Sequence, residues 1–461
     1  MKPSTRRQFL GQTAGSVAGA SLAGVARPAL AAQPIARPTS RVLGANDRIR
    51  LGFIGCGMQF QDLLRRGFLP RRERQGDIEF VEVCDIWQPR VDNAKVKTGA
   101  ERSGRDYRAL LGRADIDGVV IVVPDHLHYT IARAALLAGK DVYLEKPMTY
   151  TIDEAAKLQD VVQQTGRMLQ VGGSGLNSPL HQKLHQYVQA GKMGKVVWGF
   201  ISYNRNTTEG MWDYPIPGIG SEAWPDAPIT PENLDWQAWL GGAPKRPFSK
   251  ERYFRWRKFW DYSGGNATDL LFHRLGALSA IVGFDFPSRV VGAGGIYVQK
   301  NRQVPDTYMT TVEYPEAYCF NMVSCMANAE SAPITVYGNW GTLQVLPWVR
   351  TAGQPAPRGG GRGVIKAERT YEKQFKEAND GLTELEITTE EPMEDLADNW
   401  LNSMRSRQAP IYDVTKGYQV TVAIQLGVQS YREGRALGYD PKTRRILTET
   451  APRPEYPPAE G

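Results

Sequence analysis

Cysteine is scarce in this chain, with four residues among 461. Cys319 and Cys325 fall within one strand-like run, where six residues of extended chain separate them by roughly 20 Å, beyond disulfide reach. Cys56 and Cys84 each end a separate apolar run and are typical of small buried residues. Four cysteines in a secreted chain could form two disulfides, but these positions lead us to expect none.

Acidic residues are absent from the first 32 positions, which carry four basic side chains. The formal net charge of the whole chain is +7, so it falls to +3 without this segment. A remainder so close to neutral shows no basic stripe for phosphates, and we expect no nucleic-acid partner. Hydrophobic residues make up 41% of the chain, which indicates neither a disordered chain nor a membrane protein.

The N-terminus also lacks an apolar run long enough for a convincing membrane-spanning helix. Residues 5–10 form a twin-arginine pattern, followed by a weakly apolar segment at 11–26 and a small-residue cleavage site at 29–31. We interpret residues 1–32 as a signal peptide for the twin-arginine export machinery, which carries folded cargo, and predict a periplasmic protein. A disordered basic leader is the alternative. No cysteine follows the apolar segment, so we expect no membrane anchor.

Residues 49–172 alternate short apolar strands with helical segments, which predicts right-handed crossovers and a doubly wound parallel sheet. Residues 33–48, rich in proline, arginine and serine, are interpreted as a linker or arm. The expected strands cover residues 50–55, 77–84, 116–123, 141–144 and 168–171. The expected helices cover residues 59–68, 129–138 and 152–165.

Longer strands with few helices follow over residues 173–440, which predicts a mixed or antiparallel sheet. An aromatic-rich insertion at 204–265 interrupts this part, and residues 441–461 are interpreted as a C-terminal tail. The expected strands cover residues 196–203, 290–298, 307–314, 318–326, 334–337 and 342–345, and the expected helices 179–190, 394–405 and 417–434. The fold class is therefore an α/β domain followed by a β-sheet domain with closing helices.

A glycine-rich turn follows the first expected strand at Ile54-Gly55-Cys56-Gly57. Glycine lets the backbone approach a pyrophosphate at the N-terminus of a helix, which here begins near Met58. Phe60 replaces the third expected glycine, and an ordinary strand–turn–helix is the alternative. Asp85 ends the second strand, where a carboxylate can accept hydrogen bonds from both ribose hydroxyls of NAD and would repel the 2′-phosphate of NADP. We therefore predict NAD as the cofactor.

A histidine-containing loop, Val123-Pro124-Asp125-His126-Leu127-His128, follows the most β-branched strand. Such a loop lies at the carboxyl edge of a parallel sheet, where ligands bind, so Pro124 and His126 are expected to line the nicotinamide side. His126 and His128 could be metal ligands, but no further ligand cluster is visible in the sequence. We predict no metal site.

Glu145-Lys146-Pro147 emerges from the next strand at the same edge of the sheet. Lysine is seldom buried without a task, and here it can hydrogen-bond a reacting hydroxyl or shuttle its proton, with Glu145 beside the cofactor. Asp269 and His273 are four residues apart in a segment of helical spacing, so one helix face carries both. The carboxylate can hold a hydroxyl or orient the imidazole, which can take a proton. A solvated lysine and a surface ion pair are the alternatives.

The insertion before Asp269 is rich in aromatic rings and hydrogen-bond donors. Aromatic faces stack on the C–H faces of sugars while polar groups hydrogen-bond the hydroxyls. Simple core packing is the alternative for at least half of these rings. We expect substrate contacts from Tyr203, Arg205, Trp256 and Arg257.

These motifs together resemble the glucose–fructose oxidoreductase and inositol dehydrogenase family (Gfo/Idh/MocA) over roughly residues 48–440. The most specific matches are the segments 116–128, 138–147 and 265–273. The resemblance implies a Rossmann domain, an open-faced β-sheet domain that often forms an oligomer interface, and catalysis by Lys146, Asp269 and His273. Gly55, Gly57 and Asp85 are similar to the family's cofactor residues, and we expect a homo-oligomer.

Members of this family oxidise sugars and polyols, so we predict oxidation of a ring hydroxyl on a sugar, polyol or glycoside. Free nicotinamide cofactor is expected to be scarce outside the cytoplasm, so an exported member should retain its NAD and regenerate it in place. One exported branch hydrolyses glycosides by transient oxidation, but its His-Gly-Gly type motif is not found here. That redox-neutral glycosidase and a non-catalytic sugar-binding protein are the alternatives.

Overall fold

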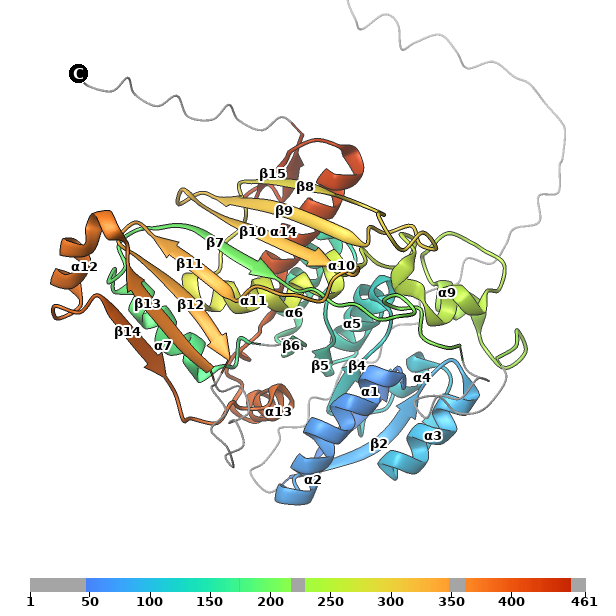
Figure 1. Ribbon diagram of the computed structural model, residues 1–461. Coiled ribbons are helices and arrows are strands. Elements are labelled where there is room, and N and C mark those ends of the chain that lie inside the picture. The colour runs from blue at the N-terminus through green and yellow to red at the C-terminus, as the bar shows by residue number, and fades with distance from the viewer. Residues whose placement is uncertain (1–46, 174, 217–228, 348–360, 449–461) are drawn as a thin grey trace, which may run out of the picture. The chain divides into compact units, whose positions relative to one another are not determined.

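The computed structural model describes residues 47–173, 175–216, 229–347 and 361–448 (Figure 1). The predicted signal peptide, nearly all of the predicted arm and most of the predicted tail lie outside these residues, so they stay predictions. Within the described ranges, no helix combines the length and apolar character needed to cross a membrane.

The chain first builds a six-stranded parallel sheet, coloured blue to teal in Figure 1. Its strand order is β3-β2-β1-β4-β5-β6, so the chain changes direction of winding between β1 and β4, where a crevice opens at the carboxyl ends of the strands. The β-branched residues of these strands are buried on both sides, as a sheet covered on two faces requires. The strands are β1 (Ile49–Ile54), β2 (Ile78–Cys84), β3 (Arg102–Gly104), β4 (Gly118–Ile121), β5 (Asp141–Leu144) and β6 (Leu169–Val171).

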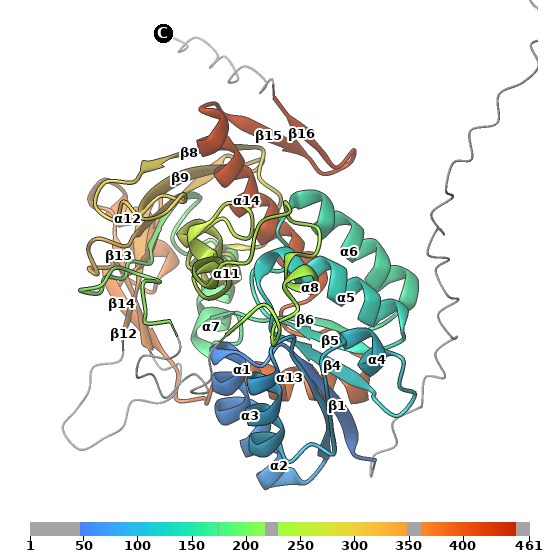
Figure 2. The same cartoon turned by 90° about the vertical axis from the view of Figure 1, so that its right-hand side faces the viewer.

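Helices cover both faces of this sheet (Figure 2). The helix α6 begins with a capping box, in which Thr151 and Glu154 satisfy each other's backbone N–H groups, and ends at Gly166 with φ +63°. The helices of this part are α1 (Met58–Leu63), α2 (Leu69–Gln75), α3 (Gln88–Thr98), α4 (Tyr107–Leu111), α5 (His128–Leu137) and α6 (Ile152–Thr165).

The stretch between Gly55 and Asp85 corrects one expectation. The helix expected over residues 59–68 extends further, because α1 continues through a π-helical turn, Leu64–Phe68, into α2, which ends at Gln75. Arg71 is 4% exposed and forms an ion pair with Asp77 at 2.6 Å, so this polar side chain is buried in the fold. The long spacing before Asp85 is therefore helical.

A ten-stranded mixed sheet follows, with the order β14-β13-β12-β11-β7-β10-β9-β8-β15-β16. Only β7 and β10 pair in parallel within the described sheet; the other pairs are antiparallel. Residues alternate between buried and accessible along β9 and β10, as expected for a sheet with one covered face. The strands are β7 (Val196–Ser202), β8 (Arg289–Gly295), β9 (Thr307–Tyr314), β10 (Tyr318–Cys325), β11 (Ile334–Gly338), β12 (Gly341–Pro347), β13 (Gly361–Ala367), β14 (Glu384–Thr388), β15 (Leu437–Asp440) and β16 (Arg445–Leu447).

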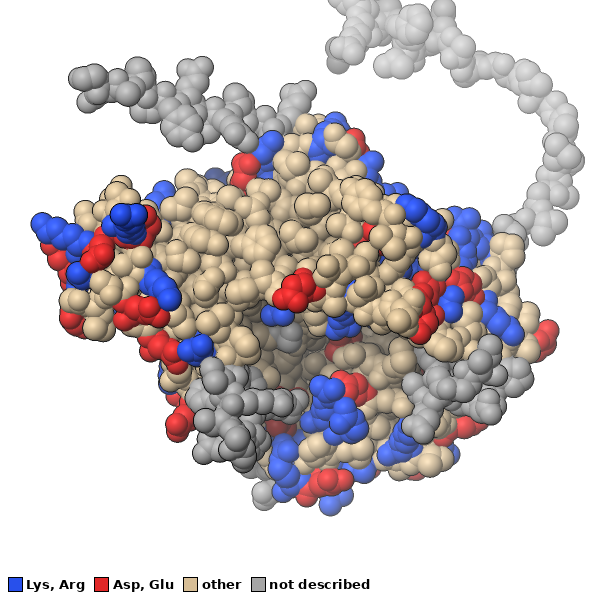
Figure 3. Space-filling model, in the orientation of Figure 1, with Lys and Arg blue, Asp and Glu red and all other residues tan. Residues whose placement is uncertain are grey.

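The helices α7 (Pro179–Gln189), α11 (Leu271–Val282) and α14 (Val414–Glu433) pack on one face of the ten-stranded sheet. Its other face carries few charged side chains over β8 to β10 (Figure 3). The fold class predicted from the sequence, a doubly wound parallel sheet followed by an open-faced mixed sheet, is confirmed.

Two segments from the second half of the chain pack against the first sheet. The helix α13 (Leu396–Ser406) inserts Trp400, whose ring centroid lies 6.2 Å from Phe68 and 5.9 Å from Tyr143. In the insertion, α8 (Trp236–Leu240) and α9 (Lys250–Phe254) form an aromatic cluster around Trp87, which follows β2. These contacts fix the position of the insertion over the crevice.

Candidate active site

The glycine turn after β1 brings the backbone close to the switch point of the sheet. Gly55 has φ +89°, and a Cβ atom there would lie 2.2 Å from the carbonyl oxygen of Val122. Gly57 precedes α1, and Met58, the first helical residue, is 38% exposed and lines the cleft. Phe60 points into the core, with its ring centroid 5.4 Å from that of Phe53. Because Phe60 is turned into the core, it does not obstruct the N-terminus of α1, although it replaces the third expected glycine.

Asp85 closes this end of the cleft, as the sequence predicts. Its Oδ2 accepts a hydrogen bond from the backbone N–H of Cys56 at 2.7 Å, and its Oδ1 accepts one from Trp87 at 3.0 Å. Each carboxylate oxygen keeps a further lone pair, so Asp85 can also accept hydroxyl groups. The glycine turn, the N-terminus of α1 and this fixed carboxylate fit the pyrophosphate and ribose of a dinucleotide.

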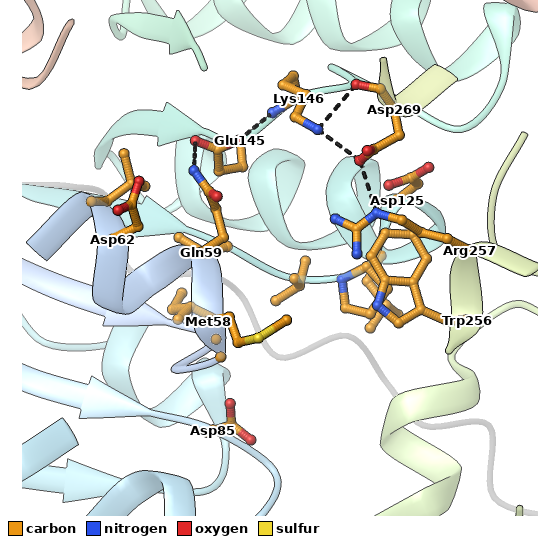
Figure 4. Close-up of a pocket in the computed structure, with 18 of the residues that line it drawn as sticks. Met58, Gln59, Asp62, Asp85, Asp125, Glu145, Lys146, Trp256, Arg257 and Asp269 are labelled. Atoms are coloured by element: carbon orange, nitrogen blue, oxygen red, sulfur yellow. Dashed lines mark hydrogen bonds and ion pairs between the residues drawn. The ribbon is translucent and has the colours of Figure 1, made fainter. Parts of the chain in front are cut away.

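Lys146, Asp269 and Arg257 form an ion cluster at the other end of the cleft (Figure 4). Lys146 Nζ lies 2.7 Å from Asp269 Oδ1, and Arg257 Nε donates to the same oxygen at 2.8 Å. Burial opposes ionisation of Asp269, but the charges of Arg257 and Lys146 outweigh it and hold the pKa of that carboxyl well below its usual range. The carboxylate thus fixes both cations.

Two neighbours hold the backbone around Lys146. The buried Glu145 accepts hydrogen bonds from Gln59 Nε2 at 3.3 Å and from the N–H of Lys146 at 3.1 Å, and burial raises its pKa. His128 lies with Nδ1 2.6 Å from the carbonyl oxygen of Pro147 and Nε2 2.8 Å from that of Val123. It therefore braces the loop after β5 against the loop after β4.

His273 faces the cleft from α11, as predicted, next to the Tyr203 ring at a centroid distance of 6.2 Å. Burial and then the nearby charge of Lys146 lower the pKa of His273 to about 3, so its ring is neutral at ordinary pH. The predicted single helix is divided into α10 (Asn266–Asp269) and α11 at Leu270, yet Asp269 and His273 both line the cleft.

The loop after β4 corrects a second expectation. His126 does not line the cleft; its Nε2 lies 2.8 Å from the carbonyl oxygen of Trp239, and its ring packs against the rings of Trp239 and Tyr262. The 3₁₀ turn Asp125–Leu127 rotates successive side chains apart, so Asp125 faces the cleft instead. Pro124 lines the cleft as predicted.

Asp125 is the cleft residue that sequence reasoning missed. It is 2% exposed, and Ser263 Oγ donates to its Oδ2 at 2.7 Å. Burial raises the pKa of Asp125 to about 7, although Arg257 partly opposes the shift. Its place directly after Pro124 was the available signal, but the pattern does not say which side of the loop faces the ligand.

All four predicted substrate residues line the cleft, which has a volume of about 1370 Å³. Trp212, Trp239 and Tyr253 line it as well, whereas several other rings of the insertion pack in the core, as the alternative interpretation holds. In the described part of the chain, no three His, Cys, Asp or Glu side chains gather as a metal site would require. The four residues predicted to contact the substrate are Tyr203, Arg205, Trp256 and Arg257.

Two family models match the chain. Residues 49–173 match the NAD-binding Rossmann fold of the Gfo/Idh/MocA oxidoreductases, and residues 243–439 match the C-terminal alpha/beta domain of the same family. The chain belongs to the Gfo/Idh/MocA oxidoreductase family. The family resemblance predicted from the motifs is confirmed, and with it an NAD-binding Rossmann domain.

Curated relatives within the family differ in activity. A dTDP-3,4-didehydro-2,6-dideoxy-alpha-D-glucose 3-reductase of Actinomadura kijaniata is 35% identical over 152 residues, which cover 32% of this chain and 43% of that protein. A glycosyl hydrolase family 109 protein of Shewanella amazonensis is 33% identical over 176 residues, covering 35% and 37%. The chain thus aligns with less than half of each relative.

A solved structure supports the fold of this Gfo/Idh/MocA chain. The WlbA dehydrogenase of Chromobacterium violaceum, in complex with NADH and UDP-GlcNAcA, superposes with a TM-score of 0.60 at 18% identity. The superposition covers 86% of this chain and 98% of that one. At this identity the likeness concerns the fold alone.

Proposed function

We propose that this protein oxidises a ring hydroxyl of a sugar, polyol or glycoside with a tightly held NAD. The observation that carries the proposal is the convergence of Lys146, Asp269 and His273 in one cleft with the glycine turn and Asp85. Lys146 follows β5 of the first sheet, and Asp269 and His273 come from α10 and α11, which lie between β7 and β8 of the second sheet.

The residues of the cleft support this chemistry. NAD, when bound, would accept the hydride from the carbinol carbon. The Lys146 ammonium, fixed by Asp269, can donate a hydrogen bond to the reacting oxygen, and the neutral His273 can accept one from the hydroxyl. Asp125 is a cleft carboxyl with a pKa of about 7, so it can exchange a proton near neutral pH.

Asp85 favours NAD over NADP, because its carboxylate is fixed by two backbone N–H groups and cannot easily move away from a 2′-phosphate. The insertion supports slow release of the cofactor. Leu234 bridges to Trp87, and Arg90 Nη1 donates to the Tyr253 hydroxyl at 3.0 Å. Retention suits the predicted export in folded form by the twin-arginine machinery to the periplasm, where the cofactor would be regenerated by a second sugar.

The test is to purify the protein from periplasm, denature it, and identify any released nucleotide by mass spectrometry. Native protein is then incubated with a sugar panel, and keto products are measured. We expect stoichiometric NAD and at least one keto sugar. Protein that emerges empty and fails to bind added NAD would refute the proposal.

A redox-neutral, NAD-dependent glycosidase is the second candidate, favoured by similarity to glycosyl hydrolase family 109 proteins. Release of an aryl aglycone without net NADH would select it over net oxidation. A sugar-binding protein without catalysis is the third candidate. This candidate would be preferred if Lys146→Ala left every activity unchanged.

We also propose a homo-oligomer in which a second copy covers the weakly charged face of the ten-stranded sheet (Figure 3). Val291 and Met309 are 37% and 43% exposed on β8 and β9, which carry this face. Light scattering after gel filtration tests the proposal. We expect Met309→Lys to reduce the mass of the particle toward that of one chain, and a wild-type protein that is monomeric would refute it.

A further inference from the structure

Two arginines flank the ring of Tyr203 at the mouth of the substrate half of the cleft. The guanidinium carbon of Arg205 lies 4.9 Å from the ring centroid, and that of Arg274 lies 5.0 Å from it. Arg205 Nη2 also donates to the Tyr203 hydroxyl at 2.5 Å. Aromatic rings attract cations, so Tyr203 holds both side chains in place.

Neither arginine forms an ion pair with a carboxylate among the described residues. Arg205 is exposed and lines the cleft. Arg274 is partly buried, and its Nε is buried without a hydrogen-bond partner. A guanidinium that is withdrawn from water usually has an anionic partner, because desolvating a charge is costly. The charge of Arg274 therefore lacks the compensation that the fold provides elsewhere, and the exposed Arg205 beside it is free of any carboxylate partner among the described residues.

The surrounding groups leave the substrate half of the cleft positively charged. Lys146 and Arg257 share the single carboxylate of Asp269. Asp125 is half-protonated near neutral pH, and Glu145 is buried with a raised pKa. Glu209 also lines the cleft, but it is fully exposed and bonded to Thr208, so water screens its charge.

The charges of Arg205 and Arg274 reach the reacting end of the cleft. Tyr203, which contacts both arginines, also lies next to His273 at a ring-centroid distance of 6.2 Å, and the charges of both arginines disfavour the protonated form of this imidazole. An anion bound at Arg205 would therefore lie within reach of the residues that act on the hydroxyl.

We infer that the substrate is an acidic sugar of the uronic type, whose carboxylate is bound by Arg205 and Tyr203. This inference rests on the proposed function and specifies its substrate class. The remaining planar edge of the Arg205 guanidinium can donate two parallel hydrogen bonds to two oxygens, and the Tyr203 hydroxyl can donate a third. The two coplanar oxygens of a carboxylate match this planar fork of donors.

Calorimetric binding of matched ligands to the NAD-loaded protein tests the inference. The ligands are methyl glucuronide, methyl glucoside and glucose 6-phosphate, with the galactose series as a second set. We expect the uronide to bind about tenfold to a hundredfold more tightly than the neutral glycoside, with an affinity that falls as salt is added.

The variant Arg205→Leu should remove this preference, so that the uronide binds no more tightly than the neutral glycoside. Arg445→Leu, on the remote strand β16, is the matched control and should keep the preference. Equal binding of the acidic and neutral sugars, tighter binding of the phosphate, or a preference that survives Arg205→Leu would each overturn the inference. Tight binding of uronides without oxidation would support the acidic ligand and refute the proposed oxidation, so the two failures are distinguishable.

Discussion

Replacing Asp269 by asparagine tests the ion cluster of the cleft with little change in shape. The carboxylate lies 2.7 Å from Lys146 Nζ and 2.8 Å from Arg257 Nε, and the side chains of Asp269 and Lys146 are 8% and 9% exposed. At an effective dielectric constant of about 20, each contact gains about 6 kcal/mol, most of which offsets desolvation of the charges. Removing one partner of such a cluster costs about 3–5 kcal/mol.

Asparagine keeps a carbonyl oxygen for Lys146, so we expect the free energy of unfolding to fall by the lower figure, about 3 kcal/mol. The low pKa of Asp269 means that its stabilising charge is present above the ordinary carboxyl pKa and is lost only in stronger acid. Titration of Asp269 itself should therefore not change the difference from wild type between about pH 5 and 8. Urea unfolding at several pH values measures it.

Turnover of the best sugar should fall about 100-fold or more, because Lys146 loses its anchor. Retained NAD should not change, since Asp269 lies away from the glycine turn (Figure 4). Asp261→Asn is the matched control: this carboxylate also bridges two arginines, Arg246 and Arg252, but it lies outside the cleft. The free energy of unfolding of the Asp261→Asn protein should fall by less than about 1 kcal/mol, and its turnover should not change. An Asp269→Asn protein with wild-type turnover and wild-type urea resistance would refute the reasoning.

Three further changes test the two ends of the cleft. Asp125→Asn should remove a pH dependence of stability. Because the pKa of Asp125 is about 7 in the folded protein, the wild-type free energy of unfolding should fall by about 2–4 kcal/mol as the pH rises from about 4 to about 7. Urea midpoints at pH 5 and 8 that move equally in both proteins would contradict this. Gly55→Ala should lose retained NAD, because its new methyl group would meet a carbonyl oxygen at 2.2 Å, whereas Gly76→Ala, with φ +63° and open space, should keep it. Equal NAD absorbance of the two variants after gel filtration would refute a role of the glycine turn in holding NAD. Tyr253→Phe removes the hydrogen bond from Arg90 and should speed NAD release about fivefold, measured by exchange into labelled NAD. An unchanged release rate would show that this hydrogen bond does not hold the insertion over the cofactor.

Local rules predicted the strands and helices that bear most of the site. The β-branched residues of β4 require a strand buried on both faces, and the capping box at Thr151 fixes the start of α6. The carboxyl ends of parallel strands meet at one edge, so Gly55, Asp85 and Lys146 could be placed together from order alone. The fold class and the family followed from the same motifs.

Contacts between distant segments were beyond such rules. Trp400 packs on the first sheet although it comes after β14 of the second sheet, and polar Arg71 lies inside a helix because Asp77 and Asp398 neutralise it. Whether Asp125 or His126 faces the cleft depends on the rotation of a 3₁₀ turn against Trp239, which no local spacing encodes.

The amino-acid order thus specified the strands, the glycine turn and the chemical groups available at the sheet edge, since backbone sterics and burial act over a few residues. Tertiary packing alone selected the partners: Asp269 for Lys146 across 123 positions, and Tyr203 between two arginines. Charges and rings pair according to distance in space, and that distance exists only after the chain has folded.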